Sequence, residues 1–212
     1  MQGKNRSLSD RSSAIGCLAE IISGIKSAVT PHTEPLLELF YRALGDNEAE
    51  VQSNACFAVG LLVEHSAVDL SPQYHALLAA LRPLFDVAPD AHRSRLNARD
   101  NAAGAVARLI YRNYTAVPLD QVLPVFVAAL PLKEDYVENR PVFRALFHLF
   151  RTAPQTLGPH LDALLPVFSH ILDPSGPDQI GDEGRAELIE LVKFLNTQEP
   201  AKIQAAGLTA YL

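Results

Sequence analysis

The sequence predicts an all-α protein in which pairs of helices repeat along the chain to form an α-solenoid. One pattern occurs in three segments, EVQSNACFAVGLLVEHS at 50–66, RSRLNARDNAAGAVARLIYRN at 93–113 and, more loosely, YVENRPVFRALFHLFR at 136–151. Hydrophobic residues make up 48% and aromatic residues 7% of the 212 residues, and Trp is absent, which favours helices packed through Leu, Val and Ala. The 15 prolines are spread singly through apolar segments, so they indicate the ends and bends of helices and not disorder.

A second motif fixes the length of the repeat. Leu123-Pro124-Val125-Phe126 matches Leu165-Pro166-Val167-Phe168 at a separation of 42, and Leu81-Arg82-Pro83-Leu84 lies another 42 residues upstream. This period is typical of HEAT or armadillo solenoids, whereas tetratricopeptide repeats have a period of about 34. Because each unit has two helices and not three, we expect about four to five HEAT repeats, with the recurring proline bending each first helix.

The periodicity of the apolar residues places the helices. The first helix begins at a cap formed by Ser9 or Asp10, and its apolar residues follow the three-to-four spacing of a helix. Gly45-Asp46-Asn47 marks a tight turn, and 173–182 is the clearest loop. First helices of the pairs are expected at 35–44, 70–85, 117–130 and 157–172. Second helices are expected at 10–26, 48–66, 94–113, 134–152 and 184–195, with a short closing helix at 200–211. Residues 1–8 are expected to be a flexible N-terminus, and residues 9–212 a single HEAT domain.

Charge and composition exclude several classes of protein. The formal charge is −6, with 24 acidic and 18 basic residues, so we expect no direct nucleic-acid binding. The two cysteines, Cys17 and Cys56, are too few for a disulfide framework, and they are interpreted as small core residues in a reducing compartment. No uninterrupted apolar run reaches about 18 residues, and the N-terminus lacks a signal core, so no membrane association is expected.

No catalytic or metal-binding motif is recognisable. The seven histidines are scattered over different predicted helices without a metal-ligand pair, and glycine-rich phosphate loops are missing. We therefore expect no enzyme activity, no cofactor and no metal.

The candidate binding residues come from one position of the repeat. Asn54, Asn101 and Asn139 occupy equivalent places in three copies and would lie in a row once the copies stack. Asp100 and Glu138 precede two of these asparagines, although Arg140-Pro141 follows Asn139 where the other copies have small residues. A row of amides beside carboxylates has the acceptors that an extended basic peptide needs.

Four segments carry a resemblance to a known family. They are DRSSAIGCLAEI at 10–21, VQSNACFAVGLLVEH at 51–65, RDNAAGAVARLI at 99–110 and LPLKED at 130–135. With these segments the chain resembles the C-terminal HEAT repeats of the karyopherin-β nuclear import receptors, most closely the importin-4 type, over nearly its whole length. The resemblance implies a fragment of a longer receptor, with the second helices on the concave side.

The resemblance also implies a function and partners. It implies binding of lysine-rich nuclear localisation segments in basic cargo, such as core histones and ribosomal proteins, with or without a histone chaperone. Ran is expected to bind chiefly N-terminal repeats that this chain lacks, nuclear pore proteins are further expected partners, and the receptor is expected to be a monomer that shuttles between cytoplasm and nucleus. The implied cargo-binding residues are Asn54, Asp100, Asn101, Glu134, Asp135, Tyr136, Glu138 and Asn139.

A generic HEAT scaffold is the alternative interpretation. In such a scaffold the asparagines brace adjacent repeats, and Glu134 and Asp135 are acids favoured at the start of a helix. The two interpretations differ in where the three amides point: into a groove beside carboxylates, or into the interfaces between helix pairs.

Overall fold

The computed structural model describes residues 7–212, and within that range it contains helices, turns and loops but no strand. The α-helices are α1 (Leu8–Ile25), α2 (Thr33–Leu44), α3 (Ala49–His65), α4 (Tyr74–Leu81), α5 (Arg93–Asn113), α6 (Leu119–Ala128), α7 (Asn139–Thr152), α8 (Pro154–Leu157), α9 (Leu161–Leu172), α10 (Gly181–Gln198) and α11 (Pro200–Ala205). Short 3-10 helices cover 26–32, 71–73, 82–85, 114–116, 136–138, 158–160 and 208–211.

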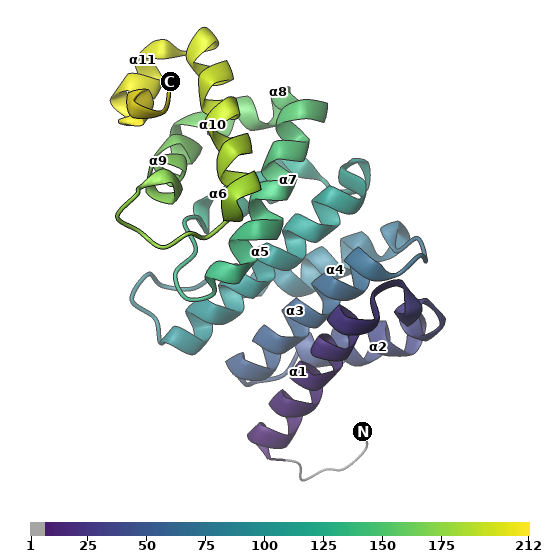
Figure 1. The fold of residues 1–212 in the computed structure, drawn as a ribbon. Coiled ribbons are helices and arrows are strands. Elements are labelled where there is room, and N and C mark those ends of the chain that lie inside the picture. Colours follow the sequence, from purple (N-terminus) through teal and green to yellow (C-terminus); the bar gives the residue numbers. More distant parts are fainter. Residues whose placement is uncertain (1–6) are drawn as a thin grey trace.

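The helices form two layers, as predicted for a HEAT solenoid. The second helices α1, α3, α5, α7 and α10 follow one another from the N-terminal to the C-terminal end of the molecule (Figure 1), and each contacts the next. The first helices α2, α4, α6 and α9 make the other layer, in which α2 contacts α4 and α6 contacts α9. The all-α solenoid predicted from the repeat is confirmed.

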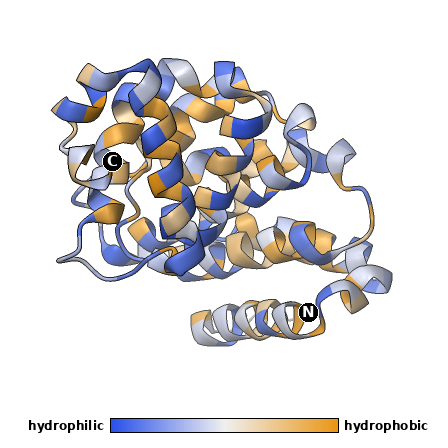
Figure 2. Ribbon diagram, turned by 45° about the horizontal axis from the view of Figure 1, so that its top comes forward, coloured by the Kyte–Doolittle hydropathy of each residue, from blue (hydrophilic) through white to orange (hydrophobic). Residues whose placement is uncertain are grey.

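The central helix α5 is the most enclosed element of the stack. Every residue from 98 to 110 is buried, because α3, α4 and α7 all pack on this helix. Small residues, above all Ala102, Ala103, Gly104 and Ala105, let these neighbours approach closely. In Figure 2 apolar colours gather where helices face one another, whereas the long loops are hydrophilic. A helix buried on all sides needs this small, largely apolar sequence.

The second helices run in the same direction. Ser53 near the start of α3 donates to Asn97 near the start of α5, with 2.5 Å between Oγ and Oδ1. Near the ends of the same helices, Glu64 pairs with Arg108. All N-terminal ends of the second helices therefore lie along one edge of the stack, and their C-terminal ends along the other.

Several predicted helices differ in extent from the observed ones. The helix expected at 157–172 is interrupted by the 3-10 segment 158–160, and the one expected at 200–211 is α-helical only over 200–205. Two further differences have a clear cause. The helix expected at 134–152 begins only at Asn139, because the backbone N–H groups of 133–135 bind the Asp100 carboxylate in a loop that leads into a 3-10 turn. The helix expected at 70–85 is α-helical only over 74–81, and Pro83 lies in the 3-10 segment that follows. Proline lacks the N–H that an α-helix would use there, whereas Pro124 and Pro166 do lie inside α6 and α9.

The predicted flexible segment 1–8 falls mostly outside the described residues, since the structure describes nothing before Ser7. Ser7 and Leu8 belong to the first helix: Ser7 forms a capping box with Asp10, and α1 begins at Leu8. Cys56 is buried as predicted, but Cys17 is exposed, because it lies on the face of α1 that no described element covers.

One stretch passes a membrane-span test that we expected no segment to pass. Leu8–Leu44 is helical, near the N-terminus, and contains a window long and apolar enough to cross a membrane, with a hydropathy of 1.3. In the structure this stretch is divided, because α1 ends at Ile25, Lys26 has a φ of 50°, and a 3-10 segment leads into α2. Ile15, Ala19 and Ile22 of α1 are buried in the helical core.

Candidate functional site on the second helices

Asn54 joins α3 to the preceding second helix. Its Nδ2 donates to the backbone oxygen of Ser12 at 2.9 Å and lies 3.0 Å from Ser12 Oγ, both on α1. Gly16 leaves room for the amide, since a Cβ there would lie 3.3 Å from Asn54 Nδ2. The side chain thus braces two repeats.

Asn101 and Asn139 reach towards the repeats that follow them. Asn101 Nδ2 donates to Asp135 Oδ2 at 3.0 Å, in the loop before α7, and to the backbone oxygen of Asn97 at 3.1 Å. Asn139 is fully buried, and its Nδ2 donates to Gln179 Oε1 at 2.6 Å, just before α10. All three recurrent amides therefore donate hydrogen bonds between adjacent repeats.

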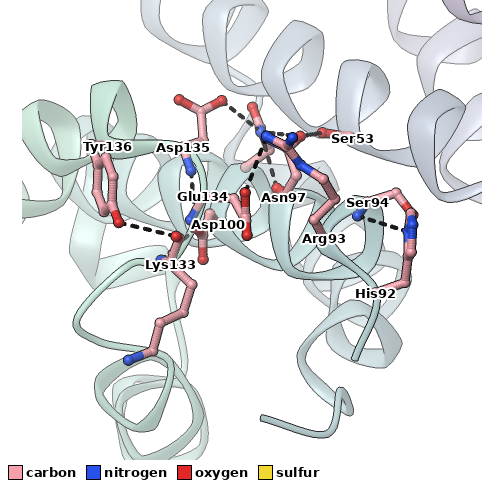
Figure 3. Close-up of polar contacts among 11 residues, drawn as sticks. Ser53, His92, Arg93, Ser94, Asn97, Asp100, Lys133, Glu134, Asp135 and Tyr136 are labelled. Carbon is pink, nitrogen blue, oxygen red and sulfur yellow. Dashed lines mark hydrogen bonds and ion pairs between the residues drawn. The ribbon is translucent and has the colours of Figure 1, made fainter. Parts of the chain in front are cut away.

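Asp100 fixes the loop that carries three of the candidate residues. Its carboxylate has no exposed surface, and Oδ2 accepts hydrogen bonds from the backbone N–H groups of Lys133 at 2.7 Å, Glu134 at 2.6 Å and Asp135 at 3.1 Å (Figure 3). Hydrogen bonds to a charged acceptor are stronger than those between neutral groups. Asp100 therefore positions the 133–135 loop against α5.

Glu138 is buried in an ion pair. It is 1% exposed, and its two oxygens accept from Arg108 Nη1 at 2.5 Å and Nη2 at 3.1 Å. Gly104 makes room for this carboxylate, because a Cβ at that position would overlap Glu138 Oε2. Burial raises the pKa of Glu138, although the positive charge of Arg108 acts in the opposite direction.

The same arginine continues the network towards α3. Arg108 Nε donates to Glu64 Oε2 at 3.0 Å, while the other Glu64 oxygen lies 2.8 Å from Arg144 Nη2 on α7. The Arg144 guanidinium lies over the ring of Tyr111 at 4.3 Å. Burial disfavours the charged form of Glu64, but Arg144 and Arg108 outweigh it and lower the carboxyl pKa. Three repeats are thereby linked by one set of charges.

Sequence reasoning missed Glu64, Arg108 and Arg144. A signal was present in the two glycines that interrupt apolar helices, Gly60 and Gly104, because a glycine in a helix interior costs stability unless close packing requires it. A Cβ at Gly60 would lie 3.0 Å from Arg108 Cδ, and Gly104 faces Glu138. Both glycines make space for a member of the network.

The remaining candidates lie at the accessible edge of the stack. Tyr136 is 43% exposed, and its hydroxyl donates to the backbone oxygen of Lys133 at 3.1 Å (Figure 3). Glu134 is partly exposed and lies 3.4 Å from Arg93 Nη2, and Asp135 is half-buried. Glu134, Asp135 and Tyr136 thus retain surface that a ligand can contact.

Charges separate along the second helices. Acidic residues gather where these helices begin: Glu48, Glu50, Glu134, Asp135, Asp182 and Glu183. The basic or titratable residues His65, Arg112 and Arg151 lie in their last turns. Each arrangement is favoured by the helix dipole, and because the helices are parallel the charges form two edges of opposite sign. Arg93, Arg95, Lys133 and Arg140 are among the basic residues on the acidic edge, and the last turns of α1 and α10 contain no basic residue.

Two hollows open among the second helices. One, of about 430 Å³, lies between α7 and α10, with Phe143, Phe147 and Ile180 among its apolar lining and Asp182 and Glu183 at its acidic side. The other, of about 310 Å³, is lined by Glu64, His65, Arg108, Tyr111, Arg112 and Arg144. Among residues 7–212, no group of three or more His, Cys, Asp or Glu side chains is arranged to hold a metal ion.

Comparison with known proteins places the chain in a family. No protein-family model matches it. The chain is 43% identical over 189 residues to the probable importin subunit beta-4 of Schizosaccharomyces pombe, covering 89% of this chain and 17% of that protein. It is 34% identical over 199 residues to importin-4 of Homo sapiens and 31% identical over 200 residues to importin-4 of Mus musculus. Each of these two matches covers 94% of this chain and 18% of the relative.

The chain therefore spans less than a fifth of the length of these relatives, while nearly all of it takes part in each match. The four sequence segments named above lie on α1, α3, α5 and the loop before α7, and the structure joins all of them through inter-repeat hydrogen bonds. Over nearly its whole length, the chain belongs to the importin-4 type of the karyopherin family.

Proposed function

We propose that this chain is a cargo-binding region of a nuclear import receptor and recognises lysine-rich segments of basic proteins, such as core histones and ribosomal proteins. The observation that carries the proposal is the match to importins over 89–94% of the chain. A fragment of a longer receptor, with residues 9–212 as one HEAT domain, is part of the same proposal. The whole receptor would shuttle between cytoplasm and nucleus and would also bind Ran and nuclear pore proteins.

The acidic edge of the second helices is the surface that fits a lysine-rich segment. Asp182 and Glu183 are exposed in the first turn of α10, and within residues 7–212 no ion pair engages them. Beside them the hollow between α7 and α10 has apolar residues that can take the methylene stem of a lysine, although Arg140 and Arg144 also line it. Carboxylates at its mouth supply acceptors for the ammonium group.

The eight candidate residues would then have two roles. Glu134, Asp135 and Tyr136 would contact the cargo, since they retain accessible surface at the same edge. The other five candidates would act indirectly, because their hydrogen bonds hold neighbouring repeats and the 133–135 loop in place. These are Asn54, Asp100, Asn101, Glu138 and Asn139.

A generic HEAT scaffold is the second candidate, and the contacts of the three amides favour it. Each amide donates to an adjacent repeat, as expected of a brace. The two candidates differ in whether the acidic edge binds lysine.

A fluorescent lysine-rich peptide tests the proposal by anisotropy, with its lysine-to-alanine version as the peptide control. Asp182→Asn with Glu183→Gln should weaken binding about 5- to 30-fold, because each exposed ion pair contributes up to about 1 kcal/mol. Asp120→Asn removes an exposed acid from the first turn of α6, on the other layer, and should leave the affinity unchanged. Asn54→Ala should lower stability but not affinity. If the lysine and alanine peptides bind equally, the chain is a scaffold.

A further inference from the structure

The hollow among α3, α5 and α7 has a charge opposite to the one that lysine-rich cargo requires. Three arginines line it, Arg108, Arg112 and Arg144, and we call it the arginine pocket. Its volume of about 310 Å³ suits a few side chains of a peptide and not a folded domain.

The acids within reach of the arginine pocket are already engaged. Glu64 is the one carboxylate that lines it, and its two oxygens are bound by Arg108 and Arg144. Glu138, buried beneath the pocket, is bound at both oxygens by Arg108. The lining carries three guanidinium groups and one carboxylate. Glu138 is bound to Arg108, and Asp69 lies outside the lining but interacts with Arg112, so the pocket itself keeps an excess of positive charge.

Guanidinium donors remain for an incoming ligand. Arg112 is exposed; its Nη2 donates a hydrogen bond to the backbone oxygen of Ser66 at 3.2 Å, and its charge interacts with Asp69. The Arg144 side chain is 37% exposed, and its Nε is buried without a hydrogen-bond partner. An unsatisfied buried donor is costly, but this atom is itself buried, so the Arg144 donors that a ligand can reach are those on the exposed part of its guanidinium.

The arginines are also held in place before any ligand arrives. The Tyr111 ring supports Arg144 at 4.3 Å, and Tyr111 is itself packed edge-to-face against His148 at 5.4 Å. Arg108 is fixed by its two carboxylate partners. A planar guanidinium held in this way binds a carboxylate through two hydrogen bonds with little loss of side-chain freedom.

We propose that the arginine pocket binds an acidic peptide segment, with an Asp or Glu carboxylate between Arg112 and Arg144. The occupant is a partner protein with a run of acidic residues, and its charge complements the pocket. This goes beyond the proposed function, because the ligand has the opposite charge. The pocket lies towards the C-terminal ends of α3 and α5, and although Arg144 also lines the hollow between α7 and α10, Arg112 lines the arginine pocket and not that hollow.

The fluorescence anisotropy of a labelled peptide of alternating Glu and Gly tests this assignment. The control is the same peptide with Gln in place of each Glu. The acidic peptide should bind, more weakly at higher salt, and the Gln peptide should not. Arg112→Gln should weaken binding about tenfold, as expected for loss of a charge-assisted hydrogen bond. Arg144→Lys, which keeps the charge but loses the planar fork, should also weaken it, whereas Arg82→Gln on the first-helix layer should not.

Circular dichroism establishes that each variant is folded, and the lysine-rich peptide separates this proposal from the previous one. Arg112→Gln should leave lysine-peptide binding intact. The arginine pocket is excluded as an acidic-peptide site if Arg112→Gln and Arg82→Gln bind the acidic peptide equally, or if the Gln peptide binds as well as the Glu peptide. If a phosphoserine peptide binds at Arg112 far more tightly than the acidic peptide does, the group that the pocket recognises is a phosphate and not a carboxylate.

Discussion

Arg108 and Glu138 form a two-point ion pair between α5 and the turn before α7, with nitrogen-to-oxygen distances of 2.5 and 3.1 Å. The pair is almost fully buried and rests on Gly104. Glu138, whose position beside Asn139 made it a candidate cargo-binding residue, therefore neutralises the charge of Arg108 in its own chain.

Glu138→Ala should be strongly destabilising. The substitution leaves Arg108 buried with Glu64 as its remaining carboxylate partner, and breaking a buried ion pair costs about 3–5 kcal/mol. Urea denaturation followed by circular dichroism measures the change in unfolding free energy. Glu38→Ala removes an exposed acid that pairs with Arg42 at 3.6 Å and should change stability by less than about 0.5 kcal/mol. Similar losses in both variants would contradict a special role for Glu138.

Gly104→Ala should also lower stability, by about 2–4 kcal/mol, since the new methyl group would displace Glu138 from Arg108. Gly24→Ala is the matched control, because a Cβ at Gly24 meets nothing within 4 Å and alanine is favoured over glycine in a helix. The thermal midpoint of each variant gives the comparison. A Gly104→Ala protein as stable as Gly24→Ala would mean that Glu138 can move without cost.

Asp100→Asn should loosen the 133–135 loop. The substitution removes the negative charge from an acceptor shared by three backbone N–H groups, at a cost of about 1–3 kcal/mol. We expect the amides of Lys133, Glu134 and Asp135 to exchange with solvent at least about tenfold faster. Hydrogen exchange measured by NMR resolves these amides from those in the middle of α5, which should keep their protection. Unchanged exchange at all three positions would show that the loop holds without the charge.

Glu64 should contribute to stability in a way that depends on pH. Because its pKa in the folded protein is lowered, its stabilising contribution is fully present above the unfolded value of about 4.3 and is lost as the pH falls through the folded value. The unfolding free energy of wild type should exceed that of Glu64→Gln by a constant amount from pH 7 to about pH 5. The margin should then shrink as the solution is acidified towards pH 3. Unfolding free energies at each pH measure it, and a margin that does not change with pH would contradict the assignment.

The sequence predicted the layers of this fold well because they depend on local patterns. Apolar spacing and the 42-residue period placed the second helices within a few residues of their observed bounds. The start of α7 was wrong because it depends on Asp100, more than 30 residues upstream, whose carboxylate binds the loop. No periodicity within 134–152 carries that information.

The candidate site was harder to predict for the same reason. Recurrence singled out Asn54, Asn101 and Asn139, but a repeated amide is equally suited to a ligand and to a neighbouring repeat. The direction of each amide is set by the partner opposite it, such as Ser12 or Gln179, which lies about 40 residues away in sequence. The network of Glu64, Arg108 and Arg144 was missed because its members come from three helices and three different repeat positions.

The placement of Glu138 against Gly104 has a mechanical consequence for the stack. A charged side chain seated in a glycine gap resists both sliding and rotation of one repeat against the next, so α3, α5 and α7 behave as a stiff block. Between α7 and α10 the hollow leaves the middle of the joint open, and the polar ties Asn139–Gln179 and Arg151–Glu187 lie towards its edges. Bending of the solenoid under load is therefore expected to concentrate at this joint, where it would widen or narrow the groove beside Asp182 and Glu183.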